Sequence, residues 1–432
     1  MAAFAAGPLE GSAVQQLEIL VRLAVFKSAN ALVCHLLQEA ADRADAAYQA
    51  RPGQHRKGRA RLRVQGIFGS FDLKRDYYYE PAAQRGHFPA DAALGLEVGY
   101  TPALARLACH ECVDGQSFEQ AEKHLRATGA IDLPARQLQR LVQRVGPAAQ
   151  EWQEREVSPE PCEAPIMYVS GDGTGVPMRQ KELAGRKGKQ EDGGSKTRQA
   201  YLGCVFTQHK RDEKGCPIRD HDSTTYLTTF GSVEVLGLLL RKEARRRGSG
   251  TAQKIILLLD GALGLENHGR INFPGCLQIV DFYHAAQHLK ILLEALWGPN
   301  HPELKKLQDR WTKLLLKDGV QRIIRQARAQ SARGARTAAV EKALGYFVHN
   351  VARMQYGTFR KEGYFIGSGV VEAGCKTVIG ARCKQAGMFW SELGAENILA
   401  LRCLERSRHW DDFWKLRANH HAALNDTLSL SA

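Results

Sequence analysis

The order of hydrophobic and polar residues predicts a mainly helical first part of the chain. Apolar residues recur at helical spacing over 14–50, which predicts one long amphipathic helix. Residues 61–79 then alternate between apolar and polar types and are rich in β-forming residues, which predicts a small hairpin. Helical periodicity returns at Pro102. We therefore expect one hairpin inside an otherwise helical N-terminal region.

A candidate helix-turn-helix lies near the end of this region. An apolar face recurs over 118–125, a break follows at 129–133, and a second apolar face runs over 138–145. The second helix also aligns three cations on one solvent stripe: Arg136, Arg140 and Arg144. A helix, a short break and a basic helix are typical of DNA-binding proteins, although any helical hairpin has a similar pattern. These arginines are therefore candidate DNA-binding residues.

The central part of the chain predicts a sheet with helices packed on it. Five short β-like runs are separated by turns and helical segments: 166–170, 201–206, 224–229, 254–259 and 276–280. The first three runs follow one another and predict an antiparallel meander. The last two are joined through helical segments and predict parallel pairing. The predicted fold class is α/β with a mixed sheet.

Composition narrows the class of protein further. The chain has 432 residues, 44% of them hydrophobic, which is enough for folded domains with real cores. No apolar run approaches the roughly 20 residues of a membrane span, so we expect a soluble, cytoplasmic protein without a membrane partner. Ten scattered cysteines favour a reducing compartment. Cys109 and Cys112 have ligand-like spacing, but no second pair follows, so no zinc is predicted.

Positive charge is concentrated in a few segments. The net charge is +14, with 60 Lys and Arg against 46 Asp and Glu. Residues 51–63 hold six basic and no acidic side chains, 181–198 mixes Gly with Lys, and 299–360 holds thirteen basic against four acidic residues. Such clusters suit phosphate backbones, whose counterions are released on binding, although a solvated face is the simpler alternative. In the last segment the candidate DNA-binding residues are Arg322, Arg325 and Arg328.

Three carboxylates have positions typical of a metal site. Asp172 and Asp260 each follow an apolar strand and precede a glycine, and ligands collect at strand ends in an open α/β sheet. Glu372 lies in the first turns of a predicted helix that Ser368 would cap. Carboxylates brought together repel one another unless divalent cations occupy the site. The pattern suggests two Mg²⁺ ions and phosphodiester chemistry, with helix caps and turns as the alternative.

The sequence Asp172-Gly173-Thr174 also suggests a phosphatase of the haloacid-dehalogenase type. Such enzymes carry a nucleophilic Asp two residues before this Asp, and here that position is Ser170. The attacking carboxylate is therefore missing from the pattern.

Taken together and in order, the motifs resemble bacterial insertion-sequence transposases of the ISKra group. The stretches that carry the resemblance are Asp172 to Arg179, Asp260-Gly261-Ala262, Phe273-Pro274-Gly275, Asp281-Phe282-Tyr283-His284-Ala285, Gly367 to Lys376 with Arg382, and Trp410 to Trp414. Relatives often carry Cys pairs before a Phe-Pro motif. This chain has no Cys between Tyr77 and its own Phe-Pro motif. A zinc ribbon is therefore not carried over.

The resemblance implies a ribonuclease-H-like fold and a catalytic, metal-binding triad. The triad residues are Asp172, Asp260 and Glu372, with two Mg²⁺ ions and with Mn²⁺ expected to substitute. Asp281 and His284 resemble an Asp-x-x-His signature that positions DNA, an N-cap Asp with a packed His being the alternative. Three further residues are predicted to position DNA: Lys376, Arg382 and Lys384.

The implied function is a DNA transposase of the Asp-Asp-Glu type. It would hydrolyse phosphodiesters at the element ends and transfer the freed 3′-hydroxyl into target DNA. The implied partners are terminal inverted repeats and target DNA, bound by a homodimer or a larger assembly in the bacterial nucleoid. Two alternatives stay open: a silent or domesticated DNA-binding protein, and a ribonuclease-H-like nuclease without strand transfer.

The predicted organisation has six segments. In chain order they are an N-terminal helix with a basic arm (1–62), the hairpin with a helix-turn-helix-like region (63–150), the first part of the catalytic core (151–298), a basic helical insertion (299–360), the Glu-bearing part of the core (361–405) and a tail (406–432).

Overall fold

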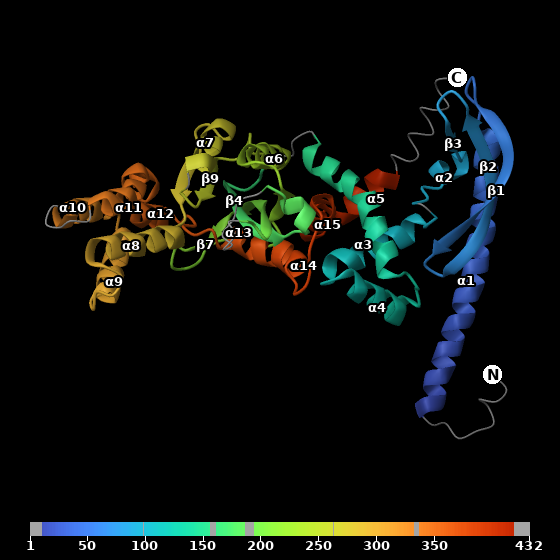
Figure 1. Cartoon of the computed structure of the whole chain (residues 1–432), viewed down its shortest axis with the longest axis horizontal. Coiled ribbons are helices and arrows are strands. Elements are labelled where there is room, and N and C mark those ends of the chain that lie inside the picture. Colours follow the sequence, from blue (N-terminus) through green and yellow to red (C-terminus); the bar gives the residue numbers. More distant parts are fainter. Residues whose placement is uncertain are drawn as a thin grey trace. The chain divides into compact units, whose positions relative to one another are not determined.

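The chain forms two compact units, which are drawn in a computed structural model in Figure 1. The structure describes residues 11–97, 99–155, 161–185, 194–261, 263–331 and 337–418. Residues 1–145 and 409–432 form the terminal unit, and residues 146–408 form the central unit. The division falls inside one long helix, after Val145.

The terminal unit packs a long helix against a small antiparallel sheet. Its elements are α1 (Gly11–Ala47), β1 (His55–Gly66), β2 (Gly69–Glu80), β3 (Arg85–His87), α2 (Pro89–Ala93), α3 (Pro102–Asp114), α4 (Phe118–Gly129) and the first half of α5 (Ala135–Glu154). The sheet order is β1-β2-β3, and a tight turn joins β1 to β2 at Gly69, where φ is +139°. Val64, Phe71 and Leu73 of the hairpin pack with Ala41 of α1. The predicted hairpin is therefore present, and it begins at His55 instead of residue 61.

The predicted basic arm is a paired strand. Residues 51–63 lead into β1, and acidic side chains neutralise four of its arginines. The ion pairs are Arg56 with Asp76 at 2.6 Å, Arg63 with Asp72 at 3.2 Å, Arg61 with Asp72, and Arg59 with Asp42 of α1. The segment predicted as a basic arm forms most of β1, because Asp72 and Asp76 of β2 lie opposite its arginines in the ladder.

Apolar residues lie on all sides of the N-terminal half of α1, interspersed with Gln15, Glu18 and Arg22, so the predicted amphipathic pattern is not found there. Leu20, Val21 and Leu23 lie close together along the helix, and all three are exposed. By length and composition alone, α1 could cross a membrane, with a mean hydropathy of 1.5 over its most apolar window. The later half of α1 packs on the hairpin through Val33, Cys34 and Leu37, and the Phe26 ring lies 5.8 Å from that of Phe68 in the hairpin turn.

The helices α3, α4 and α5 form the predicted helical region. Leu138, Leu141 and Val142 of α5 are buried, as the apolar pattern predicts. Ser117 caps α4 by accepting a hydrogen bond from the backbone of Gln120 at 3.1 Å. The helical segment 410–418 returns to this unit, where the ring of Trp410 lies 5.7 Å from that of His110.

The central unit is built on a mixed five-stranded sheet with the order β10-β9-β4-β5-β8. Its strands are β4 (Ile166–Pro177), β5 (Thr197–Gln208), β8 (Thr225–Thr229), β9 (Lys254–Leu259) and β10 (Leu277–Val280), with a separate small hairpin of β6 (Lys210–Arg211) and β7 (Pro217–Ile218). β4, β5 and β8 pair antiparallel in succession, whereas β4, β9 and β10 pair parallel. The predicted mixed α/β fold is confirmed at this level.

Apolar strands hold the core of the central unit. β9 reads Lys-Ile-Ile-Leu-Leu-Leu, and its last four side chains are buried, as expected for a strand covered on both faces. Met167, Val205 and Leu257 of the sheet pack with Leu236 of α6. The covering elements are η1 (Gln180–Leu183), α6 (Val233–Arg246), α7 (Leu263–Asn272), α13 (Gly369–Gly374), the π-helix η3 (Cys375–Gly380), α14 (Ala381–Cys383) and α15 (Glu392–Arg406).

A set of helices lies between the last strand and α13 in the chain. They are α8 (Phe282–Trp297), α9 (Leu304–Leu315), α10 (Val320–Ser331), α11 (Thr337–His349), η2 (Val351–Arg353) and α12 (Tyr356–Lys361), and Figure 1 shows them gathered on one side of the central unit. Trp311, Ile323 and Phe347 bury the faces that these helices turn toward one another. The segment 299–360 is therefore helical, in agreement with its periodicity.

Candidate functional site

The carboxyl ends of three parallel strands meet at one edge of the central sheet. Asp260 follows the last residue of β9 directly, and Asp281 follows the last residue of β10. The backbone N–H of Asp281 donates to the carbonyl of Leu259 at 2.6 Å, which puts the two strand ends side by side. β4 pairs with β9 up to Ser170, and Asp172 lies two residues farther along β4. The sequence pattern thus found three acids at neighbouring strand ends.

Asp172 lies inside a strand, which differs from the prediction of a strand that stops before it. β4 continues to Pro177 because it stays paired with β5 beyond the end of β9. The side chain of Asp172 accepts from the N–H of Gly173 at 2.7 Å and from the Cys375 thiol at 3.6 Å. The antiparallel partner therefore keeps Asp172 in extended backbone.

Asp281 is a buried connection between two helices. Its Oδ1 accepts from the N–H of His284 at 2.6 Å and so caps α8, while its Oδ2 accepts from the N–H of Ser368 just before α13. Burial raises the pKa of Asp281, but these hydrogen bonds outweigh it and hold the pKa below the ordinary value. With no exposed surface, Asp281 has no atom free to touch DNA. The capping alternative fits Asp281, and its predicted direct contact with DNA does not.

Glu372 reaches the site from α13. Its Oε1 accepts a hydrogen bond from the Ser368 hydroxyl at 3.0 Å. Ser368 was predicted to cap the helix, but its hydroxyl bonds this carboxylate instead of a backbone N–H. Gly374 permits the close approach of this helix, because a Cβ there would lie 2.6 Å from Leu202 of β5. The π-helix η3 follows at once, and π-helical turns frequently occur at functional sites.

His284 lies among the acids of this edge. Asp281, His284 and Glu372 form a group whose potential ligand atoms lie within 4.8 Å of one another. The Asp281 carboxylate raises the pKa of His284 while burial opposes it, and the charges of Asp260 and Asp172 raise it further. His284 Nδ1 is 3.3 Å from Asp281 Oδ1, yet it has no hydrogen-bond partner among the described residues. Both predicted aspartates are thus within electrostatic range of His284, although neither belongs to the compact group.

Gly261 makes room for a tyrosine side chain beside the backbone of the strand end. Its φ is +85°, and a Cβ there would lie 2.8 Å from the hydroxyl of Tyr346. That hydroxyl donates to the carbonyl of Asp260 at 3.0 Å, and the Tyr346 ring stacks on His288 at 3.7 Å. The glycine therefore admits a tyrosine from α11 and fixes the backbone at Asp260.

The donor set at this edge fits a hard divalent cation. Asp172, Asp260 and Glu372 offer carboxylate oxygens, which Mg²⁺ and Mn²⁺ prefer. Each of these three side chains is half-buried, so a cation there would still reach solvent. The Nδ1 of His284 is buried and has no hydrogen-bond partner in the described part of the chain, and it lies 3.3 Å from Asp281 Oδ1 in the group that includes Glu372.

The predicted DNA-positioning cations have different surroundings. Lys376 is exposed on η3, and Lys384 is exposed and donates to the Thr174 hydroxyl beside Asp172. Arg382 is fully buried, with its guanidinium 5.1 Å from the Trp390 ring, so the prediction that it contacts DNA does not fit the structure. Arg382 instead supports the turn after η3.

Both predicted arginine stripes are exposed. They comprise Arg136, Arg140 and Arg144 on α5, and Arg322, Arg325 and Arg328 on α10. None of the six forms an ion pair with a residue that the structure describes. By contrast, Cys109 and Cys112 are fully buried in α3, and burial raises the pKa of the Cys109 thiol.

Sequence reasoning missed Tyr346 and Cys375. Each touches one of the predicted aspartates from a distant part of the chain, 86 residues from Asp260 and 203 residues from Asp172. Burial and the Asp172 charge raise the pKa of Cys375 to about 12, so its thiol remains protonated as a donor. No local pattern marks Tyr346. Cys375 lies inside the stretch Gly367 to Lys376 that carries the resemblance, but the motif gave its thiol no role.

The likeness of the chain to known proteins is slight. No model of a protein family matches it. No curated protein matches it either. Among solved structures, a chain of the Drosophila P element transposase strand transfer complex is similar over 73% of this chain and 81% of that chain, with 11% identity and a TM-score of 0.27. A similarity of this size carries no argument about fold or function.

Proposed function

We propose that the protein is a DNA transposase with a ribonuclease-H-like catalytic core and an Asp-Asp-Glu site. The observation that carries the proposal is that the charges of Asp172 on β4 and Asp260 after β9 both raise the pKa of His284, whose potential ligand atom lies within 4.8 Å of that of Glu372 on α13. The sequence resemblance to insertion-sequence transposases of the ISKra group supports the same three residues. Asp172 lies inside a strand and Glu372 lies within helix α13, so neither of these two occupies a helix-capping position.

The chemistry is phosphodiester hydrolysis followed by strand transfer. Held by Asp172, Asp260 and Glu372, two Mg²⁺ ions would activate water and neutralise charge on the scissile phosphate, and Mn²⁺ would substitute. The water oxygen bonds to phosphorus as the 3′-oxygen leaves as a hydroxyl. That 3′-hydroxyl then attacks a phosphodiester of the target DNA, whose own 3′-oxygen leaves and takes up the proton. The residues of this chain orient the carboxylates: Ser368 holds Glu372, and Cys375 and the N–H of Gly173 hold Asp172.

The two exposed arginine stripes are proposed to bind DNA. The stripe on α5 follows α4 and would read the terminal inverted repeats as the second helix of a helix-turn-helix. The stripe on α10 would hold backbone phosphates, with Lys376 and Lys384 nearer the catalytic edge. His284, half-buried among the acids, would position the scissile phosphate.

The proposed assembly is a homodimer, or a larger complex on DNA, in the bacterial cytoplasm and nucleoid. Two element ends must be held together for strand transfer, which requires at least two catalytic sites. The exposed apolar surface of α1 supplies a surface for self-association.

Three isosteric variants test the catalytic assignment. Asp172→Asn, Asp260→Asn and Glu372→Gln should each lower Mg²⁺-dependent cleavage of labelled terminal-repeat DNA by at least about 10³-fold, since each removes a charged ligand. DNA affinity by fluorescence anisotropy should change little. Asp309→Asn on the exposed face of α9 is the matched control, with unchanged cleavage.

The outcomes distinguish the alternatives. Full cleavage in any of the three catalytic variants rejects the assignment of that residue. Binding of DNA by the unaltered protein without any cleavage indicates a silent or domesticated DNA-binding protein. Nicked substrate without a joined product indicates a nuclease that lacks strand transfer.

A further inference from the structure

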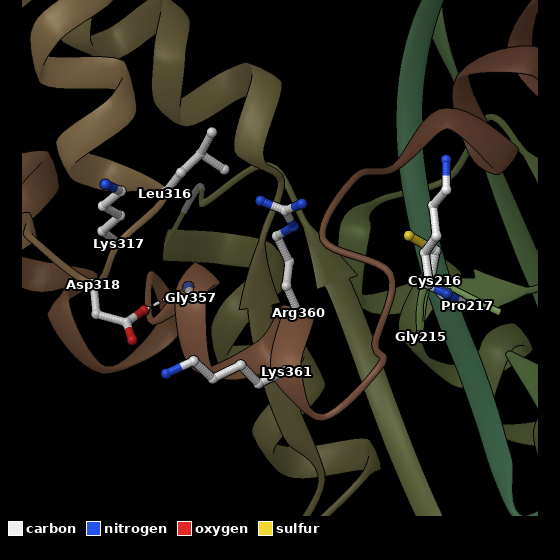
Figure 2. A pocket seen from close by; sticks show the side chains of 10 residues that line it. Gly215, Cys216, Pro217, Leu316, Lys317, Asp318, Gly357, Arg360 and Lys361 are labelled. Atoms are coloured by element: carbon white, nitrogen blue, oxygen red, sulfur yellow. Dashed lines mark hydrogen bonds between the residues drawn. The ribbon is translucent and has the colours of Figure 1, made fainter. Parts of the chain in front are cut away.

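A second candidate site, this one lined by basic residues, lies in the central unit. It shares no residue with the strand-end carboxylates. It is a cavity of about 590 Å³ between three chain segments. The segments are 214–217 in the turn of the β6–β7 hairpin, 316–318 between α9 and α10, and Gly357, Arg360 and Lys361 of α12. Figure 2 shows the hairpin turn on one side of the cavity and the helical segments on the other.

The lining is strongly cationic. Lys214, Lys317, Arg360 and Lys361 are exposed, and none of them pairs with an acid in the part of the chain that the structure describes. The single acid of the lining is Asp318. Its carboxylate accepts from the N–H of Gly357 at 2.6 Å, and from the N–H and hydroxyl of Thr358 at 3.0 and 2.8 Å. The lining therefore holds four cations without an ion pair among the described residues and one carboxylate, which already accepts hydrogen bonds from the first turn of α12.

Hydrogen bonds fix the walls of this cavity in place. Asp212 Oδ1 accepts from the N–H of Lys214 at 2.9 Å and from that of Cys216 at 2.7 Å, which shapes the hairpin turn. Arg211 then donates to the carbonyl of Glu362, at the end of α12. The hairpin is thus attached to the helix that carries Arg360. These bonds hold the walls that carry Lys214 and Arg360 beside the same cavity.

From this arrangement we propose that the cavity binds backbone phosphates of duplex DNA, apart from the catalytic edge. The proposal rests on the proposed function as a DNA-binding transposase. The guanidinium of the one arginine can bind phosphate oxygens in a bidentate way, and the three lysines supply compact positive charges for the same groups. None of the ten lining residues is aromatic, so the cavity offers no ring on which a base would stack, and this favours the backbone of a duplex over a nucleotide or a single strand.

Cys216 gives a direct measure of occupancy. It lines the cavity and is the exposed one of the ten cysteines, whereas Cys34, Cys162 and Cys276 are half-buried and the others are buried. The full-length protein is treated with N-ethylmaleimide with and without short duplex DNA, and alkylation is followed peptide by peptide by mass spectrometry. At DNA about tenfold above its Kd, the Cys216 peptide should be alkylated about tenfold more slowly. The Cys34 and Cys276 peptides serve as internal controls and should not change.

A charge-neutralised variant tests the same site by affinity. Replacing three lining cations should weaken DNA binding and reduce the slope of log K against log salt by up to about 2.7, at about 0.9 for each lost phosphate contact. The substitutions are Lys214→Gln, Arg360→Gln and Lys361→Gln. The charge-matched control changes three exposed lysines of α9 and should keep both the slope and Cys216 protection: Lys305→Gln, Lys306→Gln and Lys313→Gln. Circular dichroism checks that both variants fold.

The failure of this inference is distinct from failure of the proposed function. If DNA binds by anisotropy but Cys216 reacts at its free rate, the cavity is not a DNA site, and the transposase proposal stands. If inorganic pyrophosphate protects Cys216 and DNA does not, the cavity takes free phosphate and the DNA assignment is overturned. If no DNA binds at any salt concentration, both proposals are overturned.

Discussion

At the scale of single residues, Asp281 has the most demanding position at the catalytic edge. One carboxylate accepts backbone hydrogen bonds before two different helices, at His284 and at Ser368. Ser368 in turn donates to Glu372, so Asp281 controls the approach of a proposed metal ligand without touching it. A residue placed in this way orients the site and does not itself react.

Asp281→Asn should lower the rate of DNA cleavage by about 10–100-fold, the usual effect of losing a residue that orients a metal ligand. An amide accepts with only one of its two ends, so either α8 or α13 loses its hydrogen bond. The measurement is single-turnover cleavage as Mg²⁺ is varied, where the variant should need more Mg²⁺ while DNA affinity stays constant. Asp309→Asn, with an exposed carboxylate on α9, is the control. An Asp281 variant with an unchanged Mg²⁺ requirement would contradict the positioning role.

The catalytic residues could be predicted from sequence to the extent that strand ends mark them. Asp172 and Asp260 follow apolar runs, and parallel pairing brings such ends to one edge. The partners that hold these acids come from elsewhere in the chain and leave no local pattern, as Cys375 and Tyr346 show. Arg382 was assigned from its place in the resembling motif, and a motif does not show whether a cation is exposed or, as here, buried beside Trp390.

At the scale of elements, an ion-pair cluster joins α7 to the end of α11 and to η2. Glu266 lies 2.7 Å from His349 Nε2 and 2.8 Å from Arg353, and its side chain is 15% exposed. Burial raises the pKa of Glu266, but the hydrogen bond from His349 and the charge of Arg353 outweigh it and hold the pKa below 4.5. The cluster therefore fastens a core helix to the helical insertion while Glu266 is ionised.

This cluster gives a pH dependence with a defined sign. A carboxyl group whose pKa is lower in the folded state stabilises the fold above its unfolded pKa, and the stabilisation is lost as pH falls through the folded pKa. The Tm of the unaltered protein should thus fall more steeply than that of Glu266→Gln as pH is lowered from about 5 to about 3. Glu303→Gln, at an exposed pair with Lys306, should leave the steep dependence in place. Parallel curves for Glu266→Gln and the unaltered protein would show that the cluster does not contribute.

Element boundaries were predictable where one face of each element is buried, and less so elsewhere. The five strands of the central sheet were found from their apolar runs, but β4 extends to Pro177 because its pairing with β5 outlasts its pairing with β9. The β6–β7 hairpin, two residues on each strand, was seen only as a turn. The π-helix after Glu372 has no sequence signal, since its composition suits an ordinary helix.

At the scale of the whole molecule, the net charge of +14 is less informative than its distribution. Acids of the terminal unit neutralise much of the basic segment 51–63. Among the described residues, exposed arginines without an ion pair lie on α5 and α10, and four further unpaired cations line the cavity at Lys317. The sequence gives the excess of basic over acidic residues. The pairing of β1 with β2 shows which arginines are neutralised by acids and which cations remain for a polyanion.

The exposed surface of α1 also has meaning only at this scale. A helix with apolar residues on all of its sides is normally buried by protein or by lipid. Leu20, Val21 and Leu23 are 61%, 48% and 53% exposed, which leaves their apolar area uncovered in a single chain. Since we propose a homodimer, we expect a second copy of α1 to cover this surface. A pair of α1 helices packed together would bury this apolar surface. A lipid bilayer is the other environment that the length and composition of α1 permit.

The triple variant Leu20→Ser, Val21→Ser and Leu23→Ser should convert the homodimer to a monomer, as measured by multi-angle light scattering. Each exposed leucine or valine buried in a dimer contributes about 1.5–3 kcal/mol, so losing three from each copy should weaken association by many orders of magnitude. The control is Leu238→Ser, which is 53% exposed on α6 of the central unit and should leave the mass unchanged. An unaltered protein that is monomeric at high concentration, or that stays in solution only with detergent, would instead assign α1 to another partner or to a bilayer.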